Sequence, residues 1–138
     1  MERSEQLTVD AKRENLTQVL TFIDGILESE DCDMKAMMQL DVAVEEIFIN
    51  IASYAYTDSV GKAQILVTVT EDPKAVEIEF RDKGTPFDPL AKPDPDTTLS
   101  AEERQIGGLG IYMVKKSMDK VSYEYKDGQN ILRIVRNI

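Results

Sequence analysis

A carboxylate and a carboxamide stand four residues apart in the segment LDVAVEEIFINIASYAY, at Glu46 and Asn50. Four residues is about one turn of an α-helix, so the two side chains are neighbours if this segment is helical. The carboxylate can accept a proton, and the carboxamide oxygen suits Mg²⁺, which takes few protein oxygens and completes its shell with water and phosphates. The alternative is that both residues belong to a solvated helix face.

A second candidate lies directly after the apolar segment AVEIEF, where Asp82, Lys83 and Gly84 follow one another. A carboxylate at the end of a strand can accept a hydrogen bond from an exocyclic amine, such as the N6 amine of adenine. Gly84 lets the backbone come close to a flat ring because it has no Cβ. The alternative is a tight turn, in which Asp and Gly are the usual residues.

A third candidate is the glycine-rich segment Gly107-Gly108-Leu109-Gly110-Ile111, which opens an amphipathic stretch. Glycines at a helix start leave backbone N–H groups free to face a phosphate, and the helix dipole favours its negative charge. The segment is no P-loop, because Gly-Lys-Ser/Thr does not follow, and it lacks the third spaced glycine of the dinucleotide fingerprint. The alternative is a flexible hinge between a loop and a helix.

Hydrophobic periodicity predicts the elements that must position these residues. The predicted order is strand, two helices, two strands, a long loop, a helix and a final hairpin that turns at Asp127-Gly128. Helices cover one sheet face, so we expect an α+β two-layer sandwich with a mostly antiparallel sheet. The predicted elements are a short strand around Leu7 and Val9, helices at about 13–29 and 33–57, strands at 63–70 and 75–80, a helix opened by the glycines, and two strands within 120–136.

The segment between Asp82 and Gln105 carries four of the five prolines and few apolar residues. Irregular loops of this length inside a compact domain are usually functional, so we expect a lid over the site at about residues 86–106.

Composition bounds the function. The 138 residues suit a single domain spanning 1–138, and the net charge of −10 is a poor match for nucleic acid or an anionic membrane. The absence of His excludes His-activated nucleophiles and a phosphoryl-accepting His in this chain. One Cys, no leader-like N-terminus and no long apolar stretch lead us to expect a cytoplasmic protein.

Together these segments resemble the GHKL superfamily of ATP-binding domains, which share the histidine-kinase-like Bergerat fold. Within it, the chain is most similar to the small bacterial anti-sigma-factor serine/threonine kinases, and the resemblance spans essentially its whole length. LDVAVEEIFINIASYAY resembles the N box of that family, RDKGTPFDP its first glycine box and GGLGIYMVKKSMD its second. The resemblance implies ATP and Mg²⁺ as cofactors.

The resemblance also implies roles for single residues. Glu46 is the general base on an incoming serine hydroxyl, Asn50 coordinates Mg²⁺, and Asp82 reads the adenine amine. Arg104 is the candidate for a lid arginine that stabilises the transferred phosphate, although it stands further upstream than is usual. Tyr54 replaces a His that is common four residues after the N-box asparagine. The remaining implied nucleotide contacts are Gly84, Gly107, Gly108, Leu109, Gly110, Ile111 and, as a weaker match, Asn130.

Two functional hypotheses follow. In the first, the chain is a protein-serine kinase and anti-sigma factor that phosphorylates a STAS-type antagonist. The resemblance implies that a sigma factor and a serine phosphatase are further partners and that the chain forms a homodimer. In the second, the chain is a nucleotide-dependent binding module with negligible phosphoryl transfer, which the sparse positive charge of the lid favours. A third possibility is that all three segments are structural.

Overall fold

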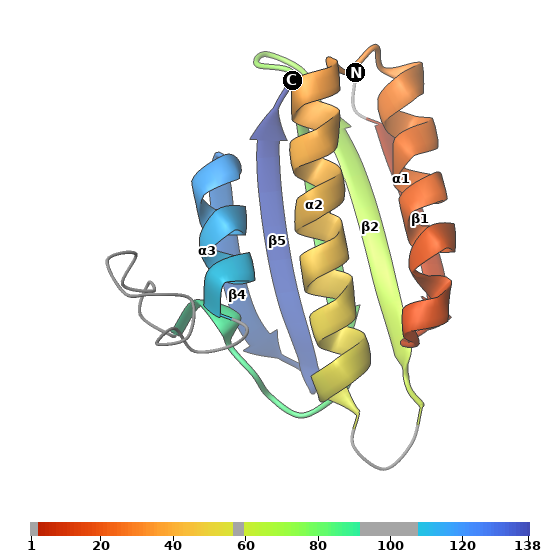
Figure 1. Cartoon of the computed structure of the whole chain (residues 1–138), viewed down its shortest axis with the longest axis vertical. Coiled ribbons are helices and arrows are strands. Elements are labelled where there is room, and N and C mark those ends of the chain that lie inside the picture. Colours follow the sequence, from red (N-terminus) through yellow and green to blue (C-terminus); the bar gives the residue numbers. More distant parts are fainter. Residues whose placement is uncertain (1–2, 57–59, 92–107) are drawn as a thin grey trace.

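The computed structural model describes residues 3–56, 60–91 and 108–138. These residues form a five-stranded antiparallel sheet in the order β1-β2-β3-β5-β4, with three helices on one face (Figure 1). The predicted α+β architecture and the predicted element order are therefore confirmed. The strands are β1 (Arg3–Asp10), β2 (Lys62–Thr70), β3 (Ala75–Asp82), β4 (Lys120–Lys126) and β5 (Gln129–Asn137), and the helices are α1 (Leu16–Ser29), α2 (Met34–Asn50) and α3 (Gly108–Ser117).

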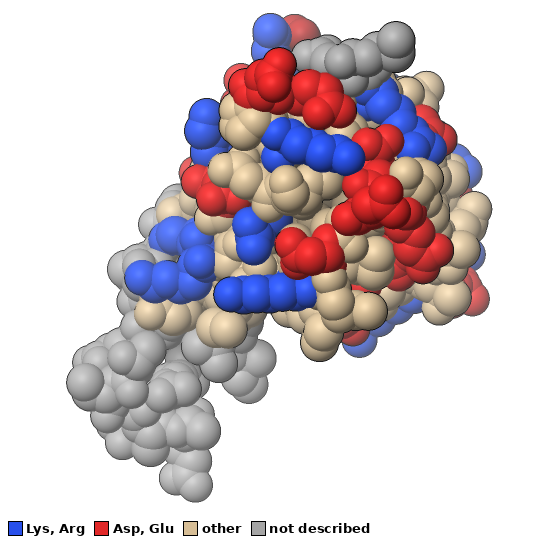
Figure 2. All heavy atoms as spheres, turned by 90° about the horizontal axis from the view of Figure 1, so that it is seen from above, with Lys and Arg blue, Asp and Glu red and all other residues tan. Residues whose placement is uncertain are grey.

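Helices α1 and α2 lie side by side on the sheet and are joined by a short acidic connection. The Asp33 carboxylate begins α2 as its N-cap, since its Oδ1 accepts a hydrogen bond from the Ala36 amide at 2.7 Å. Glu28, Asp31 and Asp33 are exposed at this end of the molecule. Viewed from this end, acidic side chains gather toward α1 (Figure 2).

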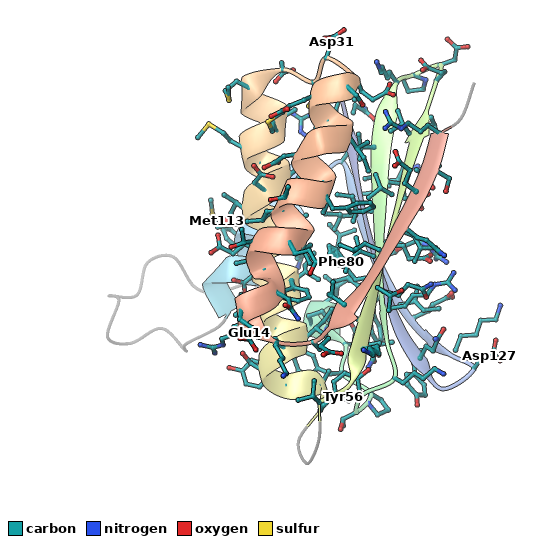
Figure 3. The ribbon with its side chains drawn as sticks, turned by 90° about the vertical axis from the view of Figure 1, so that its right-hand side faces the viewer. Glu14, Asp31, Tyr56, Phe80, Met113 and Asp127 are labelled. Atoms are coloured by element: carbon teal, nitrogen blue, oxygen red, sulfur yellow. The ribbon has the colours of Figure 1, made fainter. Side chains whose placement is uncertain are left out.

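The hydrophobic core lies between the helices and the sheet, because the strands alternate in burial and the helices carry apolar stripes. Phe80 on β3 is 1% exposed and points into this layer (Figure 3). Its cross-strand neighbours are Ile65 on β2 and Leu132 on β5. Other fully enclosed side chains are Val19, Ile23 and Leu27 of α1, Leu40, Val44, Ile47 and Phe48 of α2, Val67 of β2, and Ile78 and Ile134 of the central strands.

The second helix ends earlier than its hydrophobic pattern predicts. The α-helix stops at Asn50 and continues as a π-helical turn, η2 (Ile51–Ala55), and the predicted end at Thr57 lies outside the described residues. The wider turn frees the carbonyl of Ala55, which accepts a hydrogen bond from the Thr85 amide at 2.8 Å. Apolar periodicity does not distinguish a π turn from an α turn, so the sequence predicted one continuous helix.

The face of the sheet opposite the helices is less exposed to solvent than the alternation of apolar and charged residues in β3 suggests. Glu79 points to this face but is only 8% exposed, because Arg81 and Arg133 both donate from Nε to its carboxylate. A carboxylate paired with two guanidinium groups can be covered at modest cost.

The final hairpin follows the prediction. Asp127 and Gly128 both have positive φ, +53° and +77°, which two-residue hairpin turns require. The register places Tyr123 opposite Leu132 and Tyr125 opposite Asn130. No helix in the described ranges has the length and apolar character that crossing a bilayer would need.

Candidate functional site

One cavity joins the lower half of α2, the carboxyl end of β3 and the hairpin. Its empty space, open mouth included, is about 480 Å³. Asn50, Asp82 and Asn130, predicted from separate parts of the sequence, all line this cavity, and Ile111 of α3 closes its wall. The remaining lining residues among those described are Ile47, Ile51, Tyr54, Ala55, Phe80, Thr85, Phe87, Pro89, Tyr123 and Leu132.

Asp82 lies at the base of the cavity as the last residue of β3, 5% exposed. Its Oδ1 accepts hydrogen bonds from the Asn130 amide and the Gly84 backbone N–H, each at 2.9 Å. Burial raises the pKa of the Asp82 carboxyl, and these two donors partly oppose the rise. Within the described part of the chain both donors bind Oδ1, so Oδ2 is left for a donor from a ligand.

Asn130 holds this end of the site together. Its side chain is buried, donates to Asp82 and to the Thr85 carbonyl at 2.9 Å, and accepts from the Phe87 amide at 3.1 Å and from the Tyr123 hydroxyl. The backbone after β3 is therefore tied to the hairpin at 120–137. The weakest of the sequence-based site candidates is thus the centre of the hydrogen-bond network.

Sequence reasoning missed Tyr123 and Thr85. Tyr123 lies on the same sheet face as Val121, and the two-residue turn at Asp127-Gly128 fixes its register beside Asn130. This signal was available in the sequence once the hairpin was assigned. The contact of Thr85 with Ala55 and Asn130 gave no such signal, because it depends on the path of the chain after β3.

Gly84 is required by a close approach within the protein. A Cβ on Gly84 would lie 2.2 Å from the carbonyl oxygen of Ala55, which is far too close for any side chain. Tyr56 supports the same corner, since its hydroxyl donates to the Lys62 carbonyl at 2.7 Å and accepts from the Lys83 amide at 2.9 Å. The turn after β3 is therefore packed directly against the end of η2.

Glu46 and Asn50 occupy the side of α2 that faces α3. The Asn50 Nδ2 donates to Glu46 Oε1 at 3.3 Å, as the four-residue spacing predicts. The Glu46 carboxylate lies against the start of α3, where a Cβ on Gly110 would be 2.1 Å from Glu46 Cδ. Gly110 thus allows the first turn of α3 to approach the carboxylate. Ala43, three residues before Glu46 on the same helix, is fully buried.

The other predicted contacts are placed only in part. Gly108 and Leu109 form the first two residues of α3. Gly107 and Arg104, together with most of the predicted lid, lie outside the described residues. The beginning of the lid is described as far as a short 3₁₀ turn, η3 (Pro89–Ala91), and Pro89 lines the cavity.

This chain resembles known proteins over nearly its whole length. A family profile described as the histidine kinase-like ATPase domain matches residues 9–136. The chain belongs to this family. The histidine kinase-like ATPase match includes every predicted site residue from Glu46 to Asn130.

Curated relatives of this ATPase-domain chain carry kinase names. Serine/threonine-protein kinase BtrW of Bordetella bronchiseptica is 24% identical over 132 residues, covering 96% of this chain and 92% of that protein. Serine-protein kinase RsbW of Bacillus cereus is 27% identical over 138 residues, covering 96% and 85%. RsbW of Listeria monocytogenes is 27% identical over 131 residues, covering 91% and 82%.

Among solved structures, the RsbU and RsbW domains of Rv1364c from Mycobacterium tuberculosis superpose with a TM-score of 0.70. The match covers 98% of this chain and 32% of that chain at 14% sequence identity. At this identity the likeness establishes the fold of the histidine kinase-like ATPase domain.

Proposed function

We propose that the chain is an ATP- and Mg²⁺-binding protein-serine kinase that phosphorylates a serine of a STAS-type antagonist and acts as an anti-sigma factor. The observation that carries the proposal is that Asn50, Asp82 and Asn130 line a single cavity with the start of α3. The family membership and the kinase names of the relatives support the same function.

The end of the cavity that contains Asp82 fits adenine. Ile47, Phe80 and Leu132 give it apolar walls suited to a flat ring. Asp82 Oδ2 offers an acceptor for an exocyclic amine, while Oδ1 is held by Asn130 and Gly84. The Asp82 carboxylate lines the cavity, where this oxygen is placed to accept a hydrogen bond from an amine of the ligand.

The polar end fits a metal-bound polyphosphate. The Asn50 Nδ2 donates to Glu46, so the Asn50 Oδ1 is left to hold Mg²⁺. Mg·ATP, when bound, supplies the phosphoryl group. Glu46 Oε2 then accepts the proton of the attacking serine hydroxyl, and Asn50 keeps the Glu46 carboxylate oriented through Oε1. The N–H groups at the start of α3 would face the phosphates.

Regulatory partners follow from the same proposal. The antagonist is the phosphoryl acceptor, a sigma factor is the sequestered partner, and a serine phosphatase reverses the modification. The structural relative contains an RsbU and an RsbW domain in one chain, which supports a pairing of this kind. We propose a homodimer as the working assembly, acting in the cytoplasm.

One observation favours the second function, a nucleotide-dependent binding module. Among the described residues that line the cavity there is no Lys or Arg. Arg104, the candidate for stabilising the transferred phosphate, lies outside the described residues. A module would use the same adenine contacts and would hold its partner according to the nucleotide state, without transfer.

The deciding experiment is a phosphoryl-transfer assay with γ-labelled ATP and the STAS-domain protein whose gene lies nearest to the gene for this chain. The variants are Glu46→Gln and, as a control, the exposed Glu71→Gln in the turn between β2 and β3. A kinase gives labelled antagonist with wild type and Glu71→Gln, and at least a 100-fold lower rate with Glu46→Gln.

A parallel thermal-shift assay separates the alternatives. ATP with Mg²⁺ should raise the melting temperature of the wild type and of Glu46→Gln, because Glu46 is needed for transfer and not for binding the base. A shift without label in any variant identifies the binding module. The absence of any ATP-induced shift in the wild type would overturn both functions.

A further inference from the structure

The outward side of α2 carries a row of large apolar side chains that no described element covers. Met34, Met38 and Val42 are spaced four residues apart and are 68%, 60% and 58% exposed. At 1.5 Å per residue the row is about 12 Å long. On α3 a further methionine, Met113, is 52% exposed and also points away from the sheet (Figure 3). Met34, Met38 and Val42 are called the apolar row below.

Acidic side chains of α1 and α2 lie beside the apolar row. Asp24 and Glu28 are one turn apart on α1, and Asp41 and Glu45 are one turn apart on α2. The Asp24 and Asp41 carboxyls lie against each other where the two helices pack, and the Oδ1 atom of each is enclosed. Because α1 and α2 are antiparallel, Glu28 and Glu45 stand on opposite sides of this pair; both are exposed, and the four residues are called the acidic line below.

The charge of this region is strongly one-sided. Between Leu16 and Asn50 the sequence has eight Asp or Glu residues and a single cation, Lys35. Arg3 and Lys74, from β1 and the β2–β3 turn, are engaged with Glu30 at the end of the helix pair. In Figure 2 acidic side chains are more frequent toward α1, whereas Lys and Arg side chains are more frequent on the opposite side of the view.

We propose that the apolar row and the acidic line together form a docking surface for a basic, amphipathic helix of a partner protein. Methionine side chains adapt to the shape of a partner, so an exposed methionine row is well suited to an apolar helix face. Lys or Arg residues on the polar face of that helix can pair with the exposed Glu28 and Glu45.

Charge also decides against a second copy of this chain as the occupant. A face with this excess of acid would meet an identical acidic face in a symmetric dimer, and like charges repel. A basic helix instead supplies donors to the exposed carboxylates of Glu28 and Glu45. The surface is independent of the proposed kinase function, since Glu46 and Asn50 lie on the side of α2 that faces α3.

The test uses the full chain and two synthetic 18-residue helices labelled with fluorescein. The first has Leu on one face and Lys on the other, and the second has Glu in place of Lys. Fluorescence anisotropy at two salt concentrations measures the dissociation constant. We expect the Lys helix to bind, with an affinity that falls at high salt, and the Glu helix to bind at least 30-fold more weakly.

Matched variants connect the binding to this surface. Met38→Ser with Val42→Ser removes the apolar row, and Val60→Ser is the control because Val60 is 57% exposed elsewhere. Glu28→Gln with Glu45→Gln removes charge from the acidic line, and Glu71→Gln with Asp127→Asn removes two exposed charges outside the helix pair. We expect at least tenfold weaker binding for each surface pair and less than a twofold change for each control.

Several results would overturn the proposal. These are no binding of the Lys helix by the wild type at 100 μM, equal binding of the two helices, or equal losses in the surface and control variants. Sedimentation provides a further check: self-association of the wild type that the Met38→Ser, Val42→Ser variant abolishes would identify a second copy as the occupant. Circular dichroism melting confirms that each variant is folded before its affinity is interpreted.

Discussion

Asp82 and Asp41 are aspartates in two different regions of the molecule, and burial is the largest cause that raises the pKa of each. At the candidate site, Asp82 faces two hydrogen-bond donors, Asn130 and the Gly84 amide. Between α1 and α2, Asp41 faces a second carboxyl, Asp24, which raises the pKa of Asp41 further, to about 7. Two facing carboxyls can form a hydrogen bond only through a shared proton.

The difference shows that the partner, more than the depth of burial, decides what a buried carboxyl can do. Asp82 has one oxygen fixed by donors and one oriented for a ligand, which suits recognition of an amine. The neighbour of Asp41 offers no N–H donor, so the Asp41 carboxyl either holds a proton or needs a cation as its partner. The same residue type therefore gives a rigid binding contact in one region and an unsatisfied, acidic surface in the other.

The largest expected effect is on nucleotide binding, which should depend on Asp82 and not on Asp41. Asp82→Asn should weaken ATP binding about 100-fold, or about 2.7 kcal/mol, because the amide that replaces Oδ2 can no longer accept from the adenine amine. Asp41→Asn should change the affinity less than twofold. Isothermal titration with Mg·ATP measures both, and similar losses in the two variants would contradict the assignment of the cavity as the nucleotide site.

A second substitution gives Asp82 a carboxyl as its neighbour, which is the situation of Asp41 in the native chain. Asn130→Asp places a carboxyl against Asp82 and removes its strongest donor, so the free energy of unfolding at pH 8 should fall by about 2–3 kcal/mol. Part of the loss should be recovered at pH 5, where one carboxyl of the pair is protonated. Urea unfolding at both pH values gives the answer, with the exposed Gln18→Glu as the control for adding a carboxylate elsewhere.

Two glycines allow the packing in the two regions to be compared. Gly110→Ala brings a Cβ onto Glu46 and should destabilise the protein by about 1–3 kcal/mol and weaken ATP binding. Gly25→Ala on α1 meets nothing within 4 Å and should stabilise by about 0.5–1 kcal/mol, because alanine favours the helix. Thermal unfolding with and without ATP distinguishes the two, and equal effects would mean that α3 does not approach Glu46 closely.

The smallest expected effect comes from replacing the Asp24 carboxyl beside Asp41 by an amide. Asp24→Asn gives Asp41 a donor, so the pKa of Asp41 should fall and stability at pH 8 should rise by about 1 kcal/mol.

The pH dependence of the wild type tests the same pair. The folded-state pKa of Asp41, about 7, lies above its ordinary value of 3.8, so the folded chain holds the proton more tightly than the unfolded chain. This contribution is complete below about pH 4 and is lost as the pH rises through about 7, by roughly 1–2 kcal/mol for a partly solvated pair. Asp24→Asn should flatten the curve between pH 5 and 8. An unchanged slope would show that the two carboxyls do not share a proton.

The sequence by itself determined the element order, the sheet-and-helix architecture and four residues that line the candidate site, which are Asn50, Asp82, Ile111 and Asn130. Periodicity, the Asp127-Gly128 turn and the Glu46–Asn50 spacing are local properties, and local properties can be derived from neighbouring residues. Only the tertiary structure decided the π turn after Asn50, the contact of Gly84 with Ala55, the central place of Asn130, and the pairing of Asp24 with Asp41. Each of these depends on atoms that are distant in sequence or on a small change of helical winding, and no local pattern specifies which distant partner a buried polar group will meet.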